Sequence, residues 1–529
     1  MRTWLGLLLA LLWTSQAEAA PVSSISQYGV TWTFDHAHES GQFATGDYWV
    51  VGPVVVQSVS PAPTGMRNGS CVNPMGGRQG YDSRGGEYKT EDQVSFPRTF
   101  QAGQSIVSSV SKPEGAVIMN AGNMVSQAVL TVVDAPQPSG TFRPAFAGTY
   151  KKTFNLSQIH WDRLPKLPTP KSAPSGAQLL VQADRPRADH LSSWTIQFSC
   201  AEENWNNGPG EHACYGREVS AFISAAALHV LLDTPQQKEL AASLIQLGID
   251  NYGILKAGGN WAPNGGHHSG RKWPIVFAAA LLDDCEMKAL GTDYDDATFG
   301  EDGQTYFGAG GKALFGWDCG DGFGDYFGAG CSGSGAKDCR DPAGVVDGCI
   351  DYRNCCTSGY WVGQMLSASM LGAKSLWNHD AYFDYVDRWM AGDVADADGA
   401  DPFSEEMWTL YREHLPLPAL SRDCVASGPD AGGTSPDGGS DPSPGDTKDG
   451  GSSSSAGSDA SASTMDGSAS DPTDATHGDG CGCRVHAVQG QQPSLLLWLA
   501  ILALCSRGIL RRRRARAAAQ GSTHECAKR

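Results

Sequence analysis

A long acidic segment limits how much of this chain can fold. Residues 426–480 consist almost entirely of Ser, Gly, Asp, Pro, Thr and Ala. This composition cannot bury enough apolar surface to fold, so we expect a disordered linker. From Asp430 to Asp479 there are ten Asp, one Lys and no Glu or Arg, a net charge of −9, half of the formal −18 of the chain. The acidity therefore belongs mostly to a self-repelling tether, and no basic face indicates a nucleic-acid partner.

The first 19 residues have the order of a secretory signal peptide. Arg2 gives a positive start, Leu5–Trp13 an apolar stretch and Ala17–Ala19 a small-residue cleavage site. The apolar stretch is too short to span a membrane. We therefore expect an exported protein; the alternative is a buried N-terminal helix.

The C-terminal residues 481–516 also have the order of a processing signal. Cys481 and Cys483 stand in a Gly-Cys element, residues 493–510 are apolar, and residues 511–516 are rich in arginine. Arginines after such a span stay cytoplasmic. This order resembles the C-terminal sorting tag of myxobacterial surface proteins. The resemblance implies that Cys481 is the anchoring residue and that the protein is held at the cell surface or outer membrane, or secreted after processing. An ordinary membrane anchor is the alternative.

The cysteines fit an oxidising compartment. The chain has 15, and eleven remain when the four C-terminal ones are set aside. Most of them gather in two local groups, so we expect disulfide bonds, with a zinc cluster as the alternative. Cys71 is isolated and is the first candidate for the unpaired thiol. The grouped cysteines are Cys200 and Cys214, then Cys319, Cys331, Cys339, Cys349, Cys355 and Cys356.

Residues 20–140 have the pattern of a β domain. Apolar and polar residues alternate in 29–35, which is the period of a half-buried strand. Three further segments have the composition of strands, and the first of them is β-branched and closed by Gly and Pro. We predict a β-sandwich. The three segments are 47–61, 104–111 and 127–136.

Residues 141–425 have the pattern of a helical domain. Apolar residues recur near the 3.6-residue period, and the segments are rich in Ala, Leu and aromatic residues, which indicates helices buried on much of their circumference. Glycine-rich loops separate them, and we predict an (α/α) toroid-like catalytic domain. The chain as a whole is then an α+β multidomain protein. The predicted helical segments are 217–232, 236–255, 271–282, 358–377 and 379–390.

Two motifs connect this helical domain to a family. They are "NGGHHSGRKWP", residues 264–274, and "DYRNCCTSGYW", residues 351–361. With the helical pattern, they resemble the toroid-type polysaccharide lyases that act on alginate and glucuronan. In those lyases an Asn-His pair and an Arg meet the uronate carboxylate, and a Tyr seven residues after the Arg transfers the proton. The resemblance implies an anionic polysaccharide substrate and the catalytic residues His267, His268, Arg353 and Tyr360.

The chemistry requires residues of these types. β-Elimination takes a proton from the carbon next to a carboxylate, and cationic groups aimed at that carboxylate stabilise the developing charge. A base then removes the proton and an acid protonates the leaving oxygen. Amides and aromatic rings suit hydrogen bonding and stacking on sugars. The expected substrate-binding residues are Trp205, Asn206, Asn207, Tyr215, Arg217, Asn264, Arg271, Lys272 and Tyr352.

Two other functions fit the same sequence. A toroid glycoside hydrolase would need two carboxylates across a cleft, and no pair stands out among nine candidates. A non-catalytic carbohydrate-binding adhesin would need neither carboxylates nor a base. The candidate carboxylates are Glu202, Glu203, Glu218, Asp283, Asp284, Asp321, Asp325, Glu405 and Glu406.

Cofactors are not required by any of these functions. A metal at His267 and His268 would be strained because adjacent histidines meet one ion poorly, so we assign no metal ligands. Calcium at Asp318, Asp321 and Asp325 is an alternative to a disulfide-stapled loop, because carboxylate oxygens suit that ion. The membrane is a partner through the C-terminal segment only, and the sequence does not specify an oligomeric state.

Overall fold

The computed structural model divides the chain into two units, residues 1–464 and 465–529, and every described residue lies in the first. The predicted signal peptide, linker and sorting segment lie outside the described residues. The structure describes residues 20–114, 122–191, 200–205, 214–308, 311–316, 353–394, 397–414 and 418–423.

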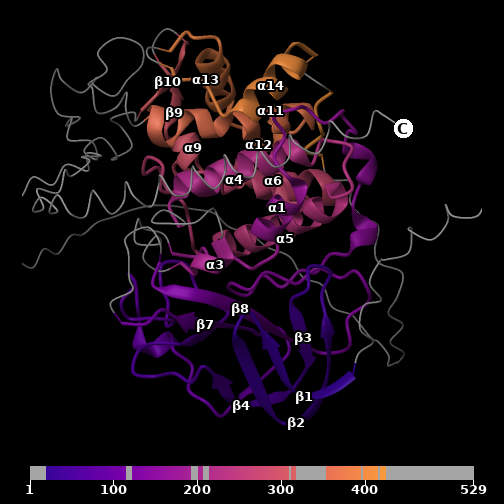
Figure 1. Ribbon diagram of the computed structural model, residues 1–529, viewed down its shortest axis with the longest axis vertical. Coiled ribbons are helices and arrows are strands. Elements are labelled where there is room, and N and C mark those ends of the chain that lie inside the picture. Colours follow the sequence, from indigo (N-terminus) through magenta and orange to yellow (C-terminus); the bar gives the residue numbers. More distant parts are fainter. Residues whose placement is uncertain are drawn as a thin grey trace, which may run out of the picture. The chain divides into compact units, whose positions relative to one another are not determined.

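The N-terminal region is built from β-strands, and a helical region follows it (Figure 1). This order confirms the sequence prediction at the level of secondary structure. The strands form one eight-stranded sheet, in the order β5-β7-β8-β3-β2-β4-β6 with β1 paired to β2. Their bounds are β1 Ala20–Gln27, β2 Val30–Gln42, β3 Tyr48–Val51, β4 Val54–Ser60, β5 Ser70–Val72, β6 Arg98–Phe100, β7 Ser105–Ser111 and β8 Met124–Val133.

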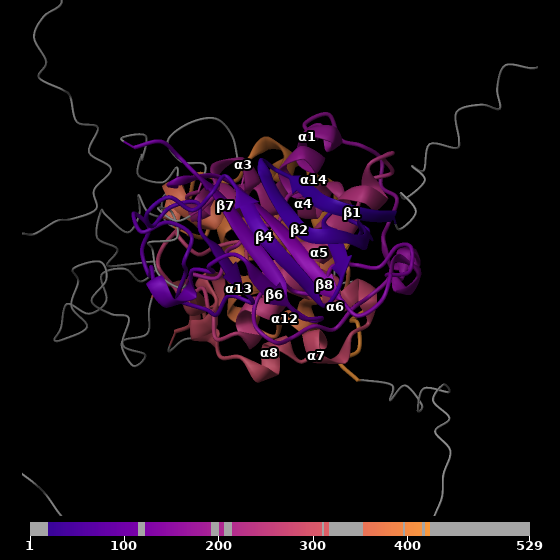
Figure 2. The same ribbon diagram turned by 90° about the horizontal axis from the view of Figure 1, so that it is seen from below.

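The sheet curls around β2 (Figure 2). Residues Thr31–Phe34 of β2 pair with β4, whereas Ser40–Gln42 pair with β3, so one strand belongs to both halves of the sheet. Trp32 is fully buried between the halves, and its indole Nε1 donates to Ser108 Oγ on β7 at 3.0 Å. A single curled sheet thus encloses the apolar core, and the two separate sheets of the predicted sandwich are not shown.

Strand β8 is buried on both faces. Ala128, Leu130 and Val132 point into the core of the curled sheet, while Met124 and Val129 belong to the core of the helical region. Successive side chains of a strand point to opposite faces, so an almost continuous apolar strand can serve two cores. The sheet and the helices therefore share one interface through β8.

The helices pack in pairs, α4 against α11 and α5 against α6. All eleven residues of α6 are buried, as expected for a helix that is apolar on every side. The closed ring of a toroid is not shown. The bounds are α1 Gly176–Ala183, α3 Glu202–Trp205, α4 Gly216–His229, α5 Gln237–Lys256, α6 Lys272–Leu282, α7 Cys285–Lys288, α8 Leu290–Asp293, α9 Gly300–Gly303, α11 Val362–Met370, α12 Lys374–Trp377, α13 Asp380–Met390 and α14 Pro402–Tyr411, with the hairpin β9 Thr305–Phe307 and β10 Ala313–Phe315.

Some of the cysteine predictions fall on described residues. Cys200 and Cys214 lie at disulfide-bonding distance, in line with their grouping in the sequence, and the neighbours Cys355 and Cys356 are bonded to each other. Cys71 is a free, buried thiol, as its isolation indicated. Burial raises the pKa of this thiol to about 12, so it stays protonated and unreactive.

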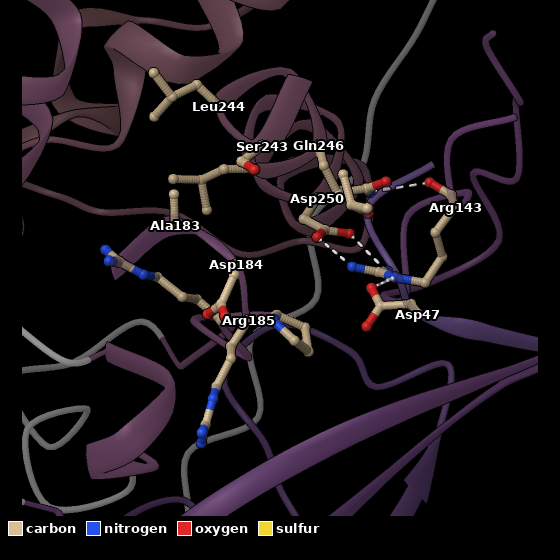
Figure 3. A pocket seen from close by; sticks show the side chains of 13 residues that line it. Asp47, Arg143, Ala183, Asp184, Arg185, Ser243, Leu244, Gln246 and Asp250 are labelled. Atoms are coloured by element: carbon tan, nitrogen blue, oxygen red, sulfur yellow. Dashed lines mark hydrogen bonds and ion pairs between the residues drawn. The ribbon is translucent and has the colours of Figure 1, made fainter. Parts of the chain in front are cut away.

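A buried ion triad joins the sheet to the helices (Figure 3). Arg143 has no exposed surface, and its Nε donates to Asp47 Oδ2 at 2.6 Å. Its two terminal nitrogens donate to both oxygens of Asp250 on α5, at 2.9 and 2.6 Å. Asp47 precedes β3, so one guanidinium holds the sheet and the longest helix together. The triad also lines a pocket.

Replacing Arg143 tests how much the fold depends on this triad. Arg143→Met leaves two buried carboxylates without their cation, so we expect a loss of about 3–5 kcal/mol in the free energy of unfolding. Urea denaturation followed by circular dichroism measures it. Arg412→Met is the matched control, because Arg412 pairs with Asp387 near the surface and its loss costs about 1 kcal/mol or less. Equal losses in the two variants would contradict a special role for the triad.

Candidate functional site

The loop between α5 and α6 carries the two histidines in a fixed conformation. Trp261 N donates to Thr298 O at 2.9 Å, which fastens the first part of the loop to the chain before α9. His268 Nδ1 lies 2.7 Å from Ala262 O and closes the loop on itself. Gly270 has φ +91°, a conformation that side chains rarely allow, and it turns the chain into α6. The His positions are therefore set by backbone contacts.

Arg271, which the sequence suggested as a substrate-binding residue, lies inside the protein. Its side chain is 1% exposed, Nε donates to Asp189 Oδ2 at 2.7 Å and Nη1 donates to Ser269 O at 2.7 Å. The guanidinium also lies over the ring of Trp205, 5.3 Å from its centroid. A carboxylate of the protein thus already neutralises this cation. Trp205 is itself fully buried.

Lys272 is compensated in the same way. Its ammonium forms a buried ion pair with Asp302, whose other oxygen accepts from Trp377 Nε1 at 2.8 Å. The rings of Phe299 and Trp377 lie 5.3 and 5.4 Å from the ammonium. A cation in the first turn of a helix is unfavourable for the helix dipole, and the internal partner offsets that cost.

Five half-buried residues meet at the N-terminal end of α4, and we call them the α4 cluster. The rings of Tyr215 and His267 make an edge contact with centroids 4.9 Å apart. The guanidinium of Arg217 lies over the ring of Tyr215 at 5.5 Å and pairs with Glu218, Nε to Oε1 at 2.7 Å. Tyr360, just before α11, is close enough to Arg217 for their charges to interact. Four of these five were predicted as site residues, and Glu218 was a candidate carboxylate.

Two glycines allow the segments of the cluster to approach so closely. A Cβ on Gly216, the first residue of α4, would stand 1.9 Å from His267 O. A Cβ on Gly266 would stand 2.7 Å from Cys356 O and 3.0 Å from Tyr215 Oη. Any other residue would push the histidine loop away from α4. These glycines therefore place His267 on Tyr215.

The electrostatics of the cluster leave its imidazole and one phenol neutral at pH 7. Burial, with the nearby His268 and Arg271, lowers the pKa of His267 to about 4. Burial raises the pKa of Tyr360, although Arg217 works in the opposite direction. A neutral imidazole can accept a proton and a neutral phenol can donate one. The cluster thus holds a possible base and a possible acid beside a cation.

The other predicted residues lie elsewhere. His268 and Arg353 are buried, with 2% and 1% of their surface exposed, and Asn264 is half-buried in the loop. Arg353 precedes Tyr360 by the seven residues of the lyase pattern, yet Arg217 is the arginine that acts on the pKa of Tyr360. The remaining predicted residues lie outside the described residues: Asn206, Asn207, Tyr352 and Cys481.

Glu301 and its neighbour Asp302 are not among the residues predicted from the sequence. Glu301 is fully buried, accepts a hydrogen bond from Gly270 N, and has a pKa raised to about 7, chiefly by burial. Its position under the histidine loop depends on the tertiary fold. Nothing in the local sequence Gly-Glu-Asp-Gly distinguishes it from a surface turn.

The carboxylates proposed for a hydrolase are engaged within the protein. Each described one accepts from a cation or caps a backbone N–H, for example Glu203 with Arg185 at 2.8 Å and Glu406 with Ser172 N at 2.9 Å. Asp321 and Asp325 lie outside the described residues. The described carboxylates are Glu202, Glu203, Glu218, Asp283, Asp284, Glu405 and Glu406.

Two groups of possible metal ligands occur among the described residues, and neither includes His267 or His268. One is Asp296, Asp302 and His379, but Lys272 and Trp377 occupy the carboxylate of Asp302. The other lies on β2. The segment proposed for calcium, with Asp318, Asp321 and Asp325, is outside the described residues.

Comparisons with known proteins do not assign the chain to a family. No family model, curated protein or solved structure matches the chain. Within the described part of the chain, none of the helices has the length and apolar character needed to cross a membrane.

His267→Gln tests whether the cluster keeps its imidazole neutral. The folded-state pKa is lowered from 6.5 to about 4, so the unfolded state binds the proton first and the wild type loses stability as the pH falls from about 6.5 to 4. In the variant we expect this loss to shrink by about 1–2 kcal/mol, below the full linkage value because the ring is partly exposed. Urea midpoints at pH 7.5 and pH 4.5 measure it. The exposed His414→Gln is the control, and an unchanged pH dependence in His267→Gln would contradict a buried neutral imidazole.

Glu301→Gln tests whether burial raises the pKa of the Glu301 carboxyl. The expected change of stability with pH is opposite in direction to the one expected for His267. The folded-state pKa is raised from 4.5 to about 7, so the wild type loses stability as the pH rises from 4.5 through 7. Glutamine cannot ionise, and we expect the variant to gain up to about 3 kcal/mol relative to the wild type between pH 4.5 and pH 8. Thermal and urea unfolding over this range measure the difference. The exposed Glu405→Gln should follow the wild-type profile, and a Glu301→Gln profile parallel to it would show that the pKa of Glu301 is not raised in the folded state.

Proposed function

We propose that this protein is exported, anchored at the cell surface through Cys481, and cleaves a uronic-acid polysaccharide by β-elimination at the α4 cluster. In this proposal the curled sheet belongs to a β-sandwich domain and the paired helices to a toroid. One observation carries the assignment of the site. An imidazole, two phenols and a guanidinium come from three separate segments and meet while half-exposed, as Tyr215, Arg217, His267 and Tyr360.

The charges of the cluster suit an anionic sugar. Arg217 is the cation of the cluster, and its Nε and one terminal nitrogen are bonded to Glu218. A guanidinium has five N–H groups, so it can bind a uronate carboxylate through the others. Neutralising that carboxylate makes the proton on the adjacent C5 carbon more acidic. Arg217 therefore takes the role that the sequence resemblance gave to Arg353.

The proton transfers follow from the protonation states. His267 is neutral at pH 7 because its pKa is near 4, so its free electron pair can take the C5 proton. The C5–H electrons then form the C4=C5 double bond, and the C4–O bond breaks. The phenol of Tyr360, whose pKa is raised by burial, can donate its proton to the leaving oxygen. A bound carboxylate also attracts positive charge and so makes His267 a stronger base.

The test uses the full chain with alginate, glucuronan, pectate, hyaluronan and heparan. Elimination creates an unsaturated uronate with a strong ultraviolet absorbance, and we expect this absorbance to rise on one polymer. Tyr360→Phe and His267→Gln should each lower kcat by about 100-fold or more, because each removes a group that moves a proton. Arg217→Gln should raise KM as well. Tyr88→Phe, whose hydroxyl bonds to Gln93 far from the cluster in sequence, is the control.

Other outcomes separate the alternatives. If the absorbance still rises in both Tyr360→Phe and His267→Gln, the protein is a lyase but the α4 cluster is not its active site. New reducing ends without absorbance would indicate a hydrolase, for which Glu301 is the carboxyl with a suitably raised pKa. Binding to a polymer without either product would indicate an adhesin.

A further inference from the structure

A metal-ligand set lies on β2, in the sheet region and apart from the α4 cluster. The sequence there is Asp35-His36-Ala37-His38. In a regular strand Asp35 would point to the opposite face from the two histidines. The pairing with β1 is irregular here, because Ser24 lies opposite Thr33 and Val22 lies opposite His38. One residue of β1 therefore faces four of β2, and this bulge turns the carboxylate towards both rings.

The three side chains converge on one point. Asp35 Oδ2 lies 3.0 Å from His36 Nδ1, and Asp35 Oδ1 lies 3.0 Å from His38 Nε2. The two imidazole rings are 4.0 Å apart between centroids and tilted by 35°. One possible ligand atom from each residue lies within 4.8 Å of the others. The arrangement thus presents two nitrogens and one carboxylate oxygen to a common centre.

These distances match the first coordination shell of a small divalent metal. Tetrahedral zinc has ligands at about 2.0–2.1 Å, which places neighbouring ligand atoms about 3.3 Å from each other. The two contacts of Asp35 with the histidines, at 3.0 Å, would lengthen by only a few tenths of an ångström to become ligand–ligand distances. Two imidazoles with one carboxylate and no thiolate suit zinc, and the oxygen-rich shells of calcium and magnesium differ from this set.

The three side chains differ in how much of their surface is exposed to solvent. His38 is 8% exposed and lies edge-on to Phe34, with ring centroids 5.7 Å apart, so its position is fixed by the core. The side chains of Asp35 and His36 are 27% and 67% exposed. Three protein ligands with an open side leave a fourth position for water, as in exchangeable and catalytic zinc sites.

We propose that Asp35, His36 and His38 form a zinc-binding site with one position open to solvent. The site differs from the other group of possible metal ligands, Asp296, Asp302 and His379, because Lys272 already forms an ion pair with Asp302 there. Without a metal, the same carboxylate would accept a hydrogen bond from each imidazole and would stabilise the bulge. The two possibilities differ in whether zinc binds, and the site does not depend on the proposed lyase function.

Titration of the purified full chain with zinc chloride tests the proposal. We expect one equivalent of zinc that is lost, or bound at least about 10-fold more weakly, in His36→Ala and in Asp35→Asn. His36 is exposed, so these variants should keep the wild-type circular dichroism. His414→Ala, another exposed histidine, should bind zinc like the wild type. Calcium chloride in place of zinc should give no binding that depends on His36.

Cobalt chloride identifies the ligands. Co²⁺ in the site should give the visible absorption of a four-coordinate ion without the near-ultraviolet band of a cobalt–thiolate bond, and His36→Ala should abolish it. A thiolate band would place the metal at cysteines, and zinc binding that is the same in the wild type, His36→Ala and Asp35→Asn would place it away from β2; either result would overturn the proposal. Absence of any zinc binding by the wild type would leave the carboxylate–histidine triad as a purely structural feature.

Discussion

The buried guanidinium of Arg143 is the interaction on which the arrangement of sheet and helices depends. It binds Asp47, which precedes β3, and Asp250 in the middle of α5. A buried charge is stable only when partners replace the water it has lost. Neither partner can be reached unless the sheet and α5 lie against each other. Because β8 is also buried on both faces, the apolar and ionic requirements fix the same interface.

The same requirement for compensation shapes the region around the histidine loop. Arg271 and Lys272 begin α6, and their partners Asp189 and Asp302 come from distant parts of the chain. These pairs hold the start of α6 in place, and they therefore also fix the end of the loop that precedes α6. His267 then rests on Tyr215 because glycines on both sides permit close backbone contact. The α4 cluster is thus positioned by buried ion pairs that need not contact a substrate.

Sequence patterns located several of the helices and strands but did not identify the partners of the buried charges. The 3.6-residue period located α4, α5, α6 and α13 closely, and β-branched runs located β4, β7 and β8. Three residues named from the sequence, His267, Arg217 and Tyr360, lie together in the α4 cluster. The sequence did not show which cations have a partner carboxylate inside the protein. Asp189, for example, lies more than eighty positions before Arg271, and only the tertiary fold brings the two together. The seven-residue interval between Arg353 and Tyr360 likewise gave no indication that Arg217, from another segment, lowers the pKa of that phenol.

Internal compensation also decides how the α4 cluster would treat an anion. Arg271 and Lys272 are already paired in the interior, so they add little net attraction for a negative ligand. Arg217 pairs with Glu218 on the same helix, and both side chains are 25% exposed. Water still reaches a half-buried pair of this kind and screens the attraction between its partners. In the proposed reaction a uronate carboxylate would bind the N–H groups of Arg217 that are not bonded to Glu218, and Glu218 would offset part of the attraction. The resulting affinity would be modest at a single sugar, and tight binding would require several sugars of the polymer to contact the surface at once.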